Sequence, residues 1–159
     1  MAELRPSSEP TWPRWERFEW DVDNDVLLRE VRPGLWVGSE LARDNYSWLA
    51  VVDLYGSSRL VTTRRELSWR ISDDIPIQLG LLDTTWPFVF HALKKGDVLI
   101  HCKAGLSRSA SVAYAILRRL DRLDHEEALR RVRVPEDTMD AWPSQPVIRS
   151  AREWVWRHR

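Results

Sequence analysis

The stretch from residue 97 to residue 120 restricts the possible folds more than any other part of the sequence. Residues 97–100 predict a strand, and apolar side chains recur after Arg108 with the spacing of a buried helix. The loop between them contains one glycine, Gly105, which permits the dihedral angles of a tight turn. A loop that leads from a strand into a helix N-terminus directs backbone N–H groups into one concavity, so this segment is suited to binding a phosphate dianion.

The same loop carries the only cysteine of the chain, Cys102. The field of a helix N-terminus and of a nearby arginine favours the thiolate form of a cysteine, so Cys102 is predicted to be a nucleophile. Arg108 can hold two phosphate oxygens in a bidentate fork, which a lysine cannot do. Ser109 is expected to donate a hydrogen bond to the departing thiolate, and His101 to orient the loop. A lone buried cysteine is usually inert, but the combination with glycine, arginine and a hydroxyl favours catalysis.

The loop His-Cys-Lys-Ala-Gly-Leu-Ser-Arg-Ser (101–109) resembles the signature loop of the protein tyrosine phosphatase superfamily. Its form Ala-Gly-x-Ser-Arg-Ser-Ala (104–110) is typical of the dual-specificity branch. A second segment, Val-Arg-Pro-Gly-Leu-Trp-Val-Gly-Ser (31–39), is similar to the opening strand pair of that branch. The resemblance covers residues 29–157 and implies hydrolysis of phosphomonoesters through a phosphocysteine intermediate on Cys102. It assigns phosphate binding to Arg108 and to the loop residues Lys103, Ala104, Gly105, Leu106 and Ser107.

Strands alternate with helices along the chain, which predicts an α/β fold. We expect a single domain with a central, mostly parallel sheet flanked by helices, and the phosphate-binding loop between a core strand and a helix. We divide the chain into a tryptophan-rich N-terminal extension, residues 1–28, and a catalytic domain, residues 29–159. Trp12, Trp15 and Trp20 either pack the extension onto the core or form an aromatic ligand surface.

Local patterns predict the elements that surround the loop. The predicted strands cover residues 31–38 (a hairpin), 50–54, 69–72 and 97–100. The predicted helices cover residues 40–48, 79–93, 108–120, 124–134 and a last segment from residue 146 onwards. Ser39 is expected to cap the first helix, and Pro87 to interrupt the second or to start a new one. Residues 60–67 fit either a short helix or an irregular segment.

The resemblance also implies an aspartate, from a neighbouring loop, that protonates the leaving oxygen and later activates water. Three residues are candidates: Asp73, Asp74 and Asp83. Asp73 and Asp74 follow the predicted strand and leave room for a full helix before Cys102, whereas Asp83 leaves room only for a short one. We therefore prefer Asp73, then Asp74, then Asp83. Each of them also suits an N-cap or a solvated loop carboxylate.

The substrate is less well defined by the sequence. The dual-specificity branch generally has a shallow pocket, and no obvious aromatic recognition loop of the deep, tyrosine-specific type is present, so phosphotyrosine and phosphoserine or phosphothreonine in proteins are the expected substrates. The alternative is a non-protein substrate such as a phosphoinositide or phosphatidylglycerophosphate. Inositol-lipid enzymes tend to have a basic residue at the position of Leu106, which argues against this alternative. A phosphate-binding module without activity would typically lack Cys102 or Arg108, and arsenate reduction usually requires further thiols.

Composition excludes several other classes of protein. The net charge of zero does not favour nucleic acid as a partner, and no apolar run is long enough for stable membrane insertion. The four histidines are scattered, so neither a metal nor another cofactor is expected. The single cysteine and the absence of a signal-peptide pattern predict a cytoplasmic protein. The oligomeric state is not predicted.

Overall fold

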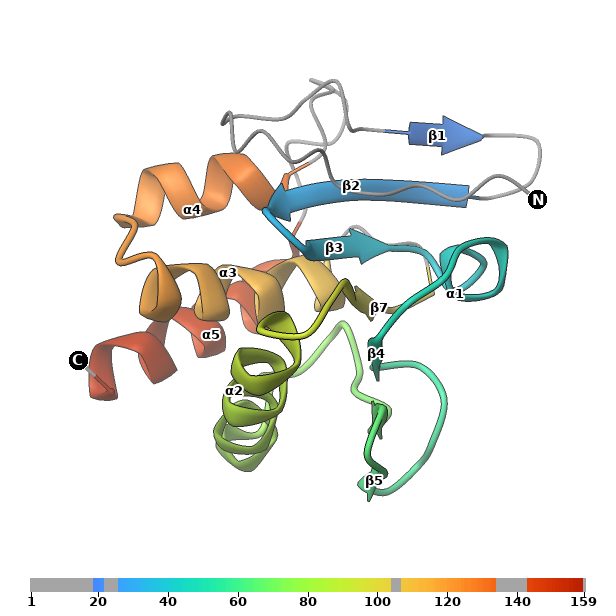
Figure 1. Ribbon diagram of the computed structural model, residues 1–159. Helices are drawn as coiled ribbons and strands as arrows, with labels where there is room; N and C mark the ends of the chain where they lie inside the picture. Colours follow the sequence, from blue (N-terminus) through green and yellow to red (C-terminus); the bar gives the residue numbers. More distant parts are fainter. Residues whose placement is uncertain (1–18, 22–25, 104–106, 134–142, 159) are drawn as a thin grey trace.

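The computed structural model describes residues 19–21, 26–103, 107–133 and 143–158. The strands are β1 (Glu19–Asp21), β2 (Val26–Arg32), β3 (Leu35–Gly38), β4 (Ala50–Asp53), β5 (Val61–Thr62), β6 (Glu66–Ser68) and β7 (Val98–His101). The helices are α1 (Ala42–Asn45), α2 (Leu79–Leu93), α3 (Arg108–Leu120), α4 (His125–Val132) and α5 (Gln145–Arg157). All of these strands belong to one sheet, and α2, α3, α4 and α5 gather on the opposite side of it from α1 (Figure 1).

The sheet has the order β1-β2-β3-β7-β4-β6-β5. Its central strands β3, β7, β4 and β6 are parallel, while β1 and β2 on one edge and β5 on the other pair antiparallel with their neighbours. The predicted α/β fold with a central parallel sheet is therefore confirmed. Because parallel strands end at the same edge, β3, β4 and β7 bring the residues that follow them to one place.

Alternating side chains of the central strands build a core on each face of the sheet. On the helical face, Val37 and Ile100 belong to the main core, together with buried residues of α2, α3 and α5. On the other face, Trp36 and Leu99 pack with Ala42 of α1 in a smaller core. The sheet is thus covered on both faces, which explains why β3 and β7 have buried side chains at every position.

The hairpin predicted for residues 31–38 is present as β2 and β3. Gly34 has a φ of +84°, a left-handed conformation that favours glycine. The Gly34 carbonyl accepts a hydrogen bond from the backbone N–H of Val98 at 2.8 Å. The turn therefore also holds the first residue of β7, the strand that leads to the cysteine.

Several local predictions were wrong. The strand expected at residues 69–72 lies earlier, at β6, because Glu66 and Ser68 are in register with Val51 and Asp53 of β4. For residues 60–67 the sequence fitted either a short helix or an irregular segment, and the structure has β5 and the start of β6 there.

Two helix predictions also need correction. The N-cap of α1 is Leu41 rather than Ser39, and the helix spans only one turn. Pro87 lies inside a single continuous α2, at an exposed position, and neither interrupts it nor starts another helix.

The predicted N-terminal extension contributes to the sheet. Glu19, Trp20 and Asp21 of β1 pair with residues of β2, although they precede the predicted boundary at residue 29. Trp12 and Trp15 lie outside the described residues, so the division into extension and catalytic domain stays a prediction. Among the described helices, none is long and apolar enough to cross a bilayer.

Candidate active site

Cys102 directly follows β7, at the edge where β3, β7 and β4 end together. The pairing of these strands places Gly38, His101 and Asp53 in one row across this edge. The backbone N–H of Leu54 donates to the His101 carbonyl at 2.9 Å. The side chain of Cys102 is buried, with 2 % of its surface exposed. The sheet edge thus fixes the thiol that the sequence predicts as the nucleophile.

The first turn of α3 carries two of the predicted residues, and one of them contacts this thiol. Ser109 is fully buried, and its Oγ lies 3.2 Å from the Sγ of Cys102. Arg108 is half-buried, and its Nη1 donates to the carbonyl oxygen of Ile71 at 3.1 Å. Because α3 begins at Arg108, its unpaired N–H groups and the positive end of its dipole face the loop. Three predicted loop residues lie outside the described residues: Ala104, Gly105 and Leu106.

A chain of polar contacts connects Asp73 with the start of α3. The backbone N–H of Ser144, the N-cap of α5, donates to Ser107 Oγ at 2.8 Å, and the two hydroxyl oxygens are 3.2 Å apart. The Ser144 Oγ also lies 2.7 Å from the carbonyl oxygen of Asp73 and 3.2 Å from its Oδ1. Ser107 directly precedes α3, so the half-buried Asp73 is linked to the loop through two hydroxyl groups.

The other two candidate aspartates have different surroundings. Asp74 is exposed. Asp83 lies in α2, where its Oδ1 accepts a hydrogen bond from Trp154 Nε1 at 2.9 Å and lies 3.1 Å from His158 Nε2. Trp154 is ten residues beyond Ser144, which corresponds to about 15 Å along α5. Asp83 therefore joins α2 to the end of α5 that lies away from the loop.

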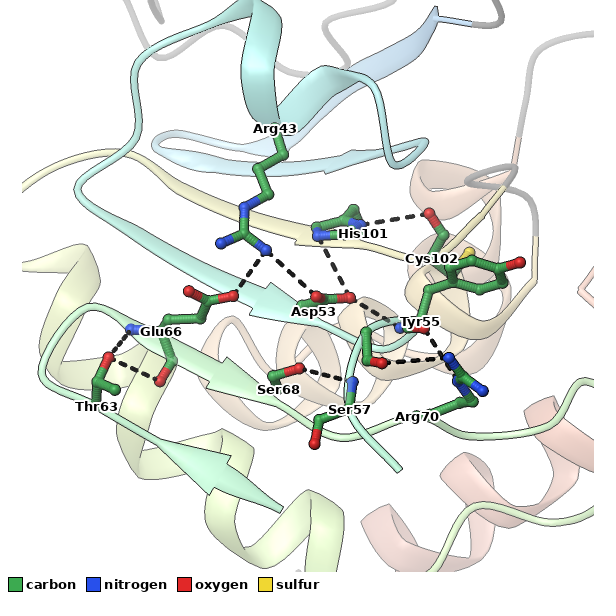
Figure 2. A network of polar contacts seen from close by, with 11 residues as sticks. Arg43, Asp53, Tyr55, Ser57, Thr63, Glu66, Ser68, Arg70, His101 and Cys102 are labelled. Carbon is green, nitrogen blue, oxygen red and sulfur yellow. Dashed lines mark hydrogen bonds and ion pairs between the residues drawn. The ribbon is translucent and has the colours of Figure 1, made fainter. Parts of the chain in front are cut away.

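His101 is held between the cysteine backbone and the neighbouring strand (Figure 2). Its Nδ1 lies 3.4 Å from the Cys102 carbonyl oxygen, and its Nε2 lies 3.5 Å from Asp53 Oδ1. Both distances are long for hydrogen bonds. Burial lowers the pKa of His101 below its usual value, more than the Asp53 carboxylate raises it. At pH 7 the side chain is therefore a neutral imidazole that touches the backbone of the predicted nucleophile.

Solved structures share this arrangement of strands and helices. Human DUSP28 aligns with a TM-score of 0.64 and 23% identity, over 83% of this chain and 97% of that one. Human tyrosine phosphatase-like serine/threonine/tyrosine-interacting protein aligns at 0.64 and 19%, over 82% and 97%. A mouse structure assigned as a dual-specificity phosphatase and complexed with zinc tungstate aligns at 0.64 and 21%, over 95% and 94%. The fold is that of the dual-specificity phosphatases.

The resemblance to the dual-specificity branch is thereby confirmed at the level of the fold. No protein-family model and no curated protein matches the sequence, so the likeness rests on structure. The described residues contain no group of three or more histidine, cysteine, aspartate or glutamate side chains that could hold a metal ion.

Within this phosphatase fold, the loop after β4 is fixed by side chains that the sequence analysis did not identify. Asp53 Oδ1 accepts a hydrogen bond from the backbone N–H of Tyr55 at 2.9 Å. Arg43 Nη1 lies 3.3 Å from Asp53 Oδ2 and 2.7 Å from Glu66 Oε1 (Figure 2). A Cβ at Gly56 would collide with the Asp53 carboxylate, so a larger residue at this position would displace that side chain. One feature of the sequence could have identified Asp53, because it lies at the end of the apolar run that forms a buried strand of the parallel sheet.

Tyr55 is the second residue that the sequence analysis missed. It is half-buried, and its ring centroid lies 5.5 Å from Cζ of Arg108. The phosphatase fold therefore has an aromatic side chain beside the predicted phosphate ligand, although the sequence shows no obvious aromatic recognition loop. The ring reaches this position because β4 and β7 are neighbours in the sheet.

A buried arginine from β2 adds to the electrostatics of the site. Arg29 is 1% exposed, and its Nε and Nη2 both donate to the carbonyl oxygen of Val132 at the end of α4. Burial lowers the pKa of Arg29 to about 10, and an electrostatic interaction with Cys102 opposes this change. Arg29 is thus a buried cation whose electrostatic interaction with Cys102 was not predicted from the sequence.

Proposed function

We propose that this chain is a cysteine-dependent phosphatase that hydrolyses phosphomonoesters through a phosphocysteine intermediate. The observation that carries the proposal is the 3.2 Å contact between Cys102 Sγ and the buried Ser109 Oγ, with Arg108 beginning the same helix. The location of the thiol at the end of a central strand, next to a helix N-terminus, supports the same chemistry. A module that only binds phosphate requires neither the thiol nor its hydroxyl partner.

The proposed reaction has two steps. In the first, the Cys102 thiolate attacks phosphorus, the S–P bond forms, and the P–O bond of the ester breaks while an aspartate protonates the leaving oxygen. In the second, the same aspartate takes a proton from water, which attacks phosphorus, and the S–P bond breaks to release inorganic phosphate. Arg108 and the N–H groups of the loop hold the phosphate oxygens in both steps. Ser109 donates its hydroxyl proton as a hydrogen bond to the departing thiolate.

We assign the aspartate of this mechanism to Asp73. Its link to Ser107 through Ser144 supports the assignment, because the segment that contains Asp73 is then anchored to the phosphate loop. Asp83 is engaged with Trp154 and His158 at the other end of α5. Asp74 is the close alternative, since it is adjacent in sequence.

We further propose phosphoproteins as the substrates, with phosphotyrosine and phosphoserine or phosphothreonine both accepted. The solved structures with this fold include a mouse structure assigned as a dual-specificity phosphatase, which supports this class. The apolar side chain of Leu106 supports it as well, because it removes a charge that would favour an inositol lipid.

The first experiment measures hydrolysis of 4-nitrophenyl phosphate in the presence of a metal chelator. The wild-type chain is expected to be active, and vanadate, a phosphate mimic, is expected to inhibit it. Cys102→Ser should abolish turnover. Arg108→Lys should reduce kcat/KM by about 100-fold or more, because lysine keeps the charge and loses the bidentate fork. An inactive wild-type chain that still binds phosphate would show a binding module instead.

A second experiment tests the acid with a matched pair of variants, Asp73→Asn and Asp74→Asn. Loss of a general acid typically costs about 10²- to 10⁴-fold, and the loss is largest when the leaving group is poor. Asp73→Asn should therefore slow phenyl phosphate far more than 4-nitrophenyl phosphate, whereas Asp74→Asn should leave their ratio unchanged. The opposite result would transfer the role to Asp74.

A further inference from the structure

Three cationic side chains surround the ring of Tyr55 at the predicted phosphate site. Measured from the ring centroid, Arg108 Cζ is at 5.5 Å, Arg70 Cζ at 5.7 Å and Lys103 Nζ at 5.9 Å. Tyr55 follows β4, Arg70 follows β6, and Lys103 and Arg108 lie between β7 and the start of α3, so the tertiary structure brings three separate segments together. Figure 2 shows Tyr55 and Arg70 near the cysteine at this edge of the sheet.

Arg70 is held in place by the backbone of the loop that carries Tyr55. Its Nε donates to the Tyr55 carbonyl oxygen at 3.1 Å, and its Nη2 donates to the Gly56 carbonyl oxygen at 3.3 Å. The backbone N–H of Arg70 also donates to the Ser57 carbonyl oxygen. The exposed guanidinium therefore has a fixed position beside the ring instead of moving freely in solvent.

The charge of this cluster is not balanced within the described part of the chain. No carboxylate there lies within ion-pair distance of Arg70, Lys103 or Arg108. Asp53 and Glu66 both contact Arg43 instead, and the Asp73 carboxylate lies 3.2 Å from Ser144 Oγ. In the proposed reaction Arg108 binds the phosphate that is hydrolysed. The loop residues, Lys103 included, contribute their backbone N–H groups to that phosphate, so the exposed side chains of Arg70 and Lys103 remain as two cations on the rim of the site.

We propose that Arg70 and Lys103 bind a second anionic group of the substrate, next to the phosphate that is hydrolysed. This inference rests on the proposed function, and it narrows the substrates to phosphopeptides with an acidic side chain or a second phosphate beside the phosphorylated residue. Charge complementarity supports it, because Arg108 and the N-terminus of α3 face the phosphate that is hydrolysed, while the exposed side chains of Arg70 and Lys103 have no carboxylate partner among the described residues. Tyr55 provides the flat apolar surface between them, against which the phosphorylated side chain packs.

The test uses three phosphotyrosyl peptides that differ only at the flanking positions, which are glutamine, glutamate or phosphoserine. The wild-type chain should have a higher kcat/KM for the glutamate peptide than for the glutamine peptide, by about 2- to 5-fold for each added charge. This ratio should decrease as salt is added, because exposed charges are screened. A higher kcat/KM with both charged peptides would show that the rim binds any anionic neighbour of the phosphotyrosine. A higher kcat/KM with the phosphoserine peptide alone would show that it binds a second phosphate.

The variants Arg70→Gln and Lys103→Gln should each lower the ratio of kcat/KM between charged and neutral peptides, whatever their effect on the neutral peptide. Lys95→Gln is the matched control, since it removes one exposed positive charge at the end of α2 and should keep the wild-type ratio. Equal rates for all three peptides, or an unchanged ratio in both rim variants, would refute the inference while leaving the phosphatase intact. Faster hydrolysis of phosphatidylinositol bisphosphate in vesicles than of every peptide would also refute it. A chain inactive on every phosphomonoester would refute the proposed function and this inference together.

Discussion

The hydroxyl of Ser109 offers a direct test of the proposed second step. It is fully buried and lies 3.2 Å from Cys102 Sγ, so Ser109→Ala removes one hydrogen bond to a charged group. Such a bond contributes about 1.5–3 kcal/mol, which corresponds to about 10- to 150-fold in rate. Because the thiolate is regenerated when the S–P bond breaks, hydrolysis of the intermediate should slow by this factor.

Stopped-flow measurement with 4-nitrophenyl phosphate separates the two steps. Ser109→Ala should release nitrophenolate in a rapid burst equal to the enzyme concentration, followed by slow turnover, because the intermediate accumulates. The matched control is Ser111→Ala on the same helix. Ser111 is also fully buried, and its Oγ has no hydrogen-bond partner among the described residues, so its removal should leave both phases unchanged. If Ser109→Ala turns over as fast as Ser111→Ala, the assigned role of Ser109 is wrong.

Three further predictions concern stability. Asp124→Ala removes the acceptor for the Glu127 N–H at 2.8 Å and should lower the free energy of unfolding in urea by about 1 kcal/mol. Asp83→Ala should lower the free energy of unfolding by a similar amount, about 1 kcal/mol, because the hydrogen bond from Trp154 is lost. Its kcat/KM should be unchanged, and a large loss of activity would instead indicate that Asp83 is the general acid. Because burial lowers the pKa of folded His101, the unfolded chain binds the proton first as the pH falls below about 6.5. Wild-type stability should therefore decline there more steeply than that of His101→Gln, and parallel declines would contradict this.

The elements next to the loop could be predicted because their signals are local. The strand at 98–101 is buried at every position and the helix at 108–120 is buried from Ser109 to Leu117, so both segments are rich in apolar residues. Asp124 caps α4 through an interaction that spans only three residues. β6 was misplaced because its position depends on pairing with β4, which is distant in sequence. Pro87 was misread for a related reason, since contacts of α2 with the core override the local preference of one residue.

The residues of the site likewise divide into those that a local sequence pattern predicts and those that only the folded sheet brings together. Cys102, Arg108 and Ser109 fall within eight residues, so a strand, a loop and a helix are enough to bring them together. Ser144 and Tyr55 approach the loop from 37 residues after Ser107 and 47 residues before Cys102, and no local pattern links them to it. Their positions follow from strand order and from the contact of α5 with α3.

The loop chemistry could thus be predicted from the sequence alone, because residues close together in the chain can arrange a candidate nucleophile, an anion ligand and a hydroxyl. The tertiary structure decided which aspartate is tethered to that loop and which cations surround Tyr55. Hydrogen bonds from Ser144 and Arg70 join segments that meet only when the parallel strands end at one edge. Interactions of this kind depend on the folded sheet, and for that reason the sequence did not reveal the positions of Tyr55 and Arg70 beside the loop.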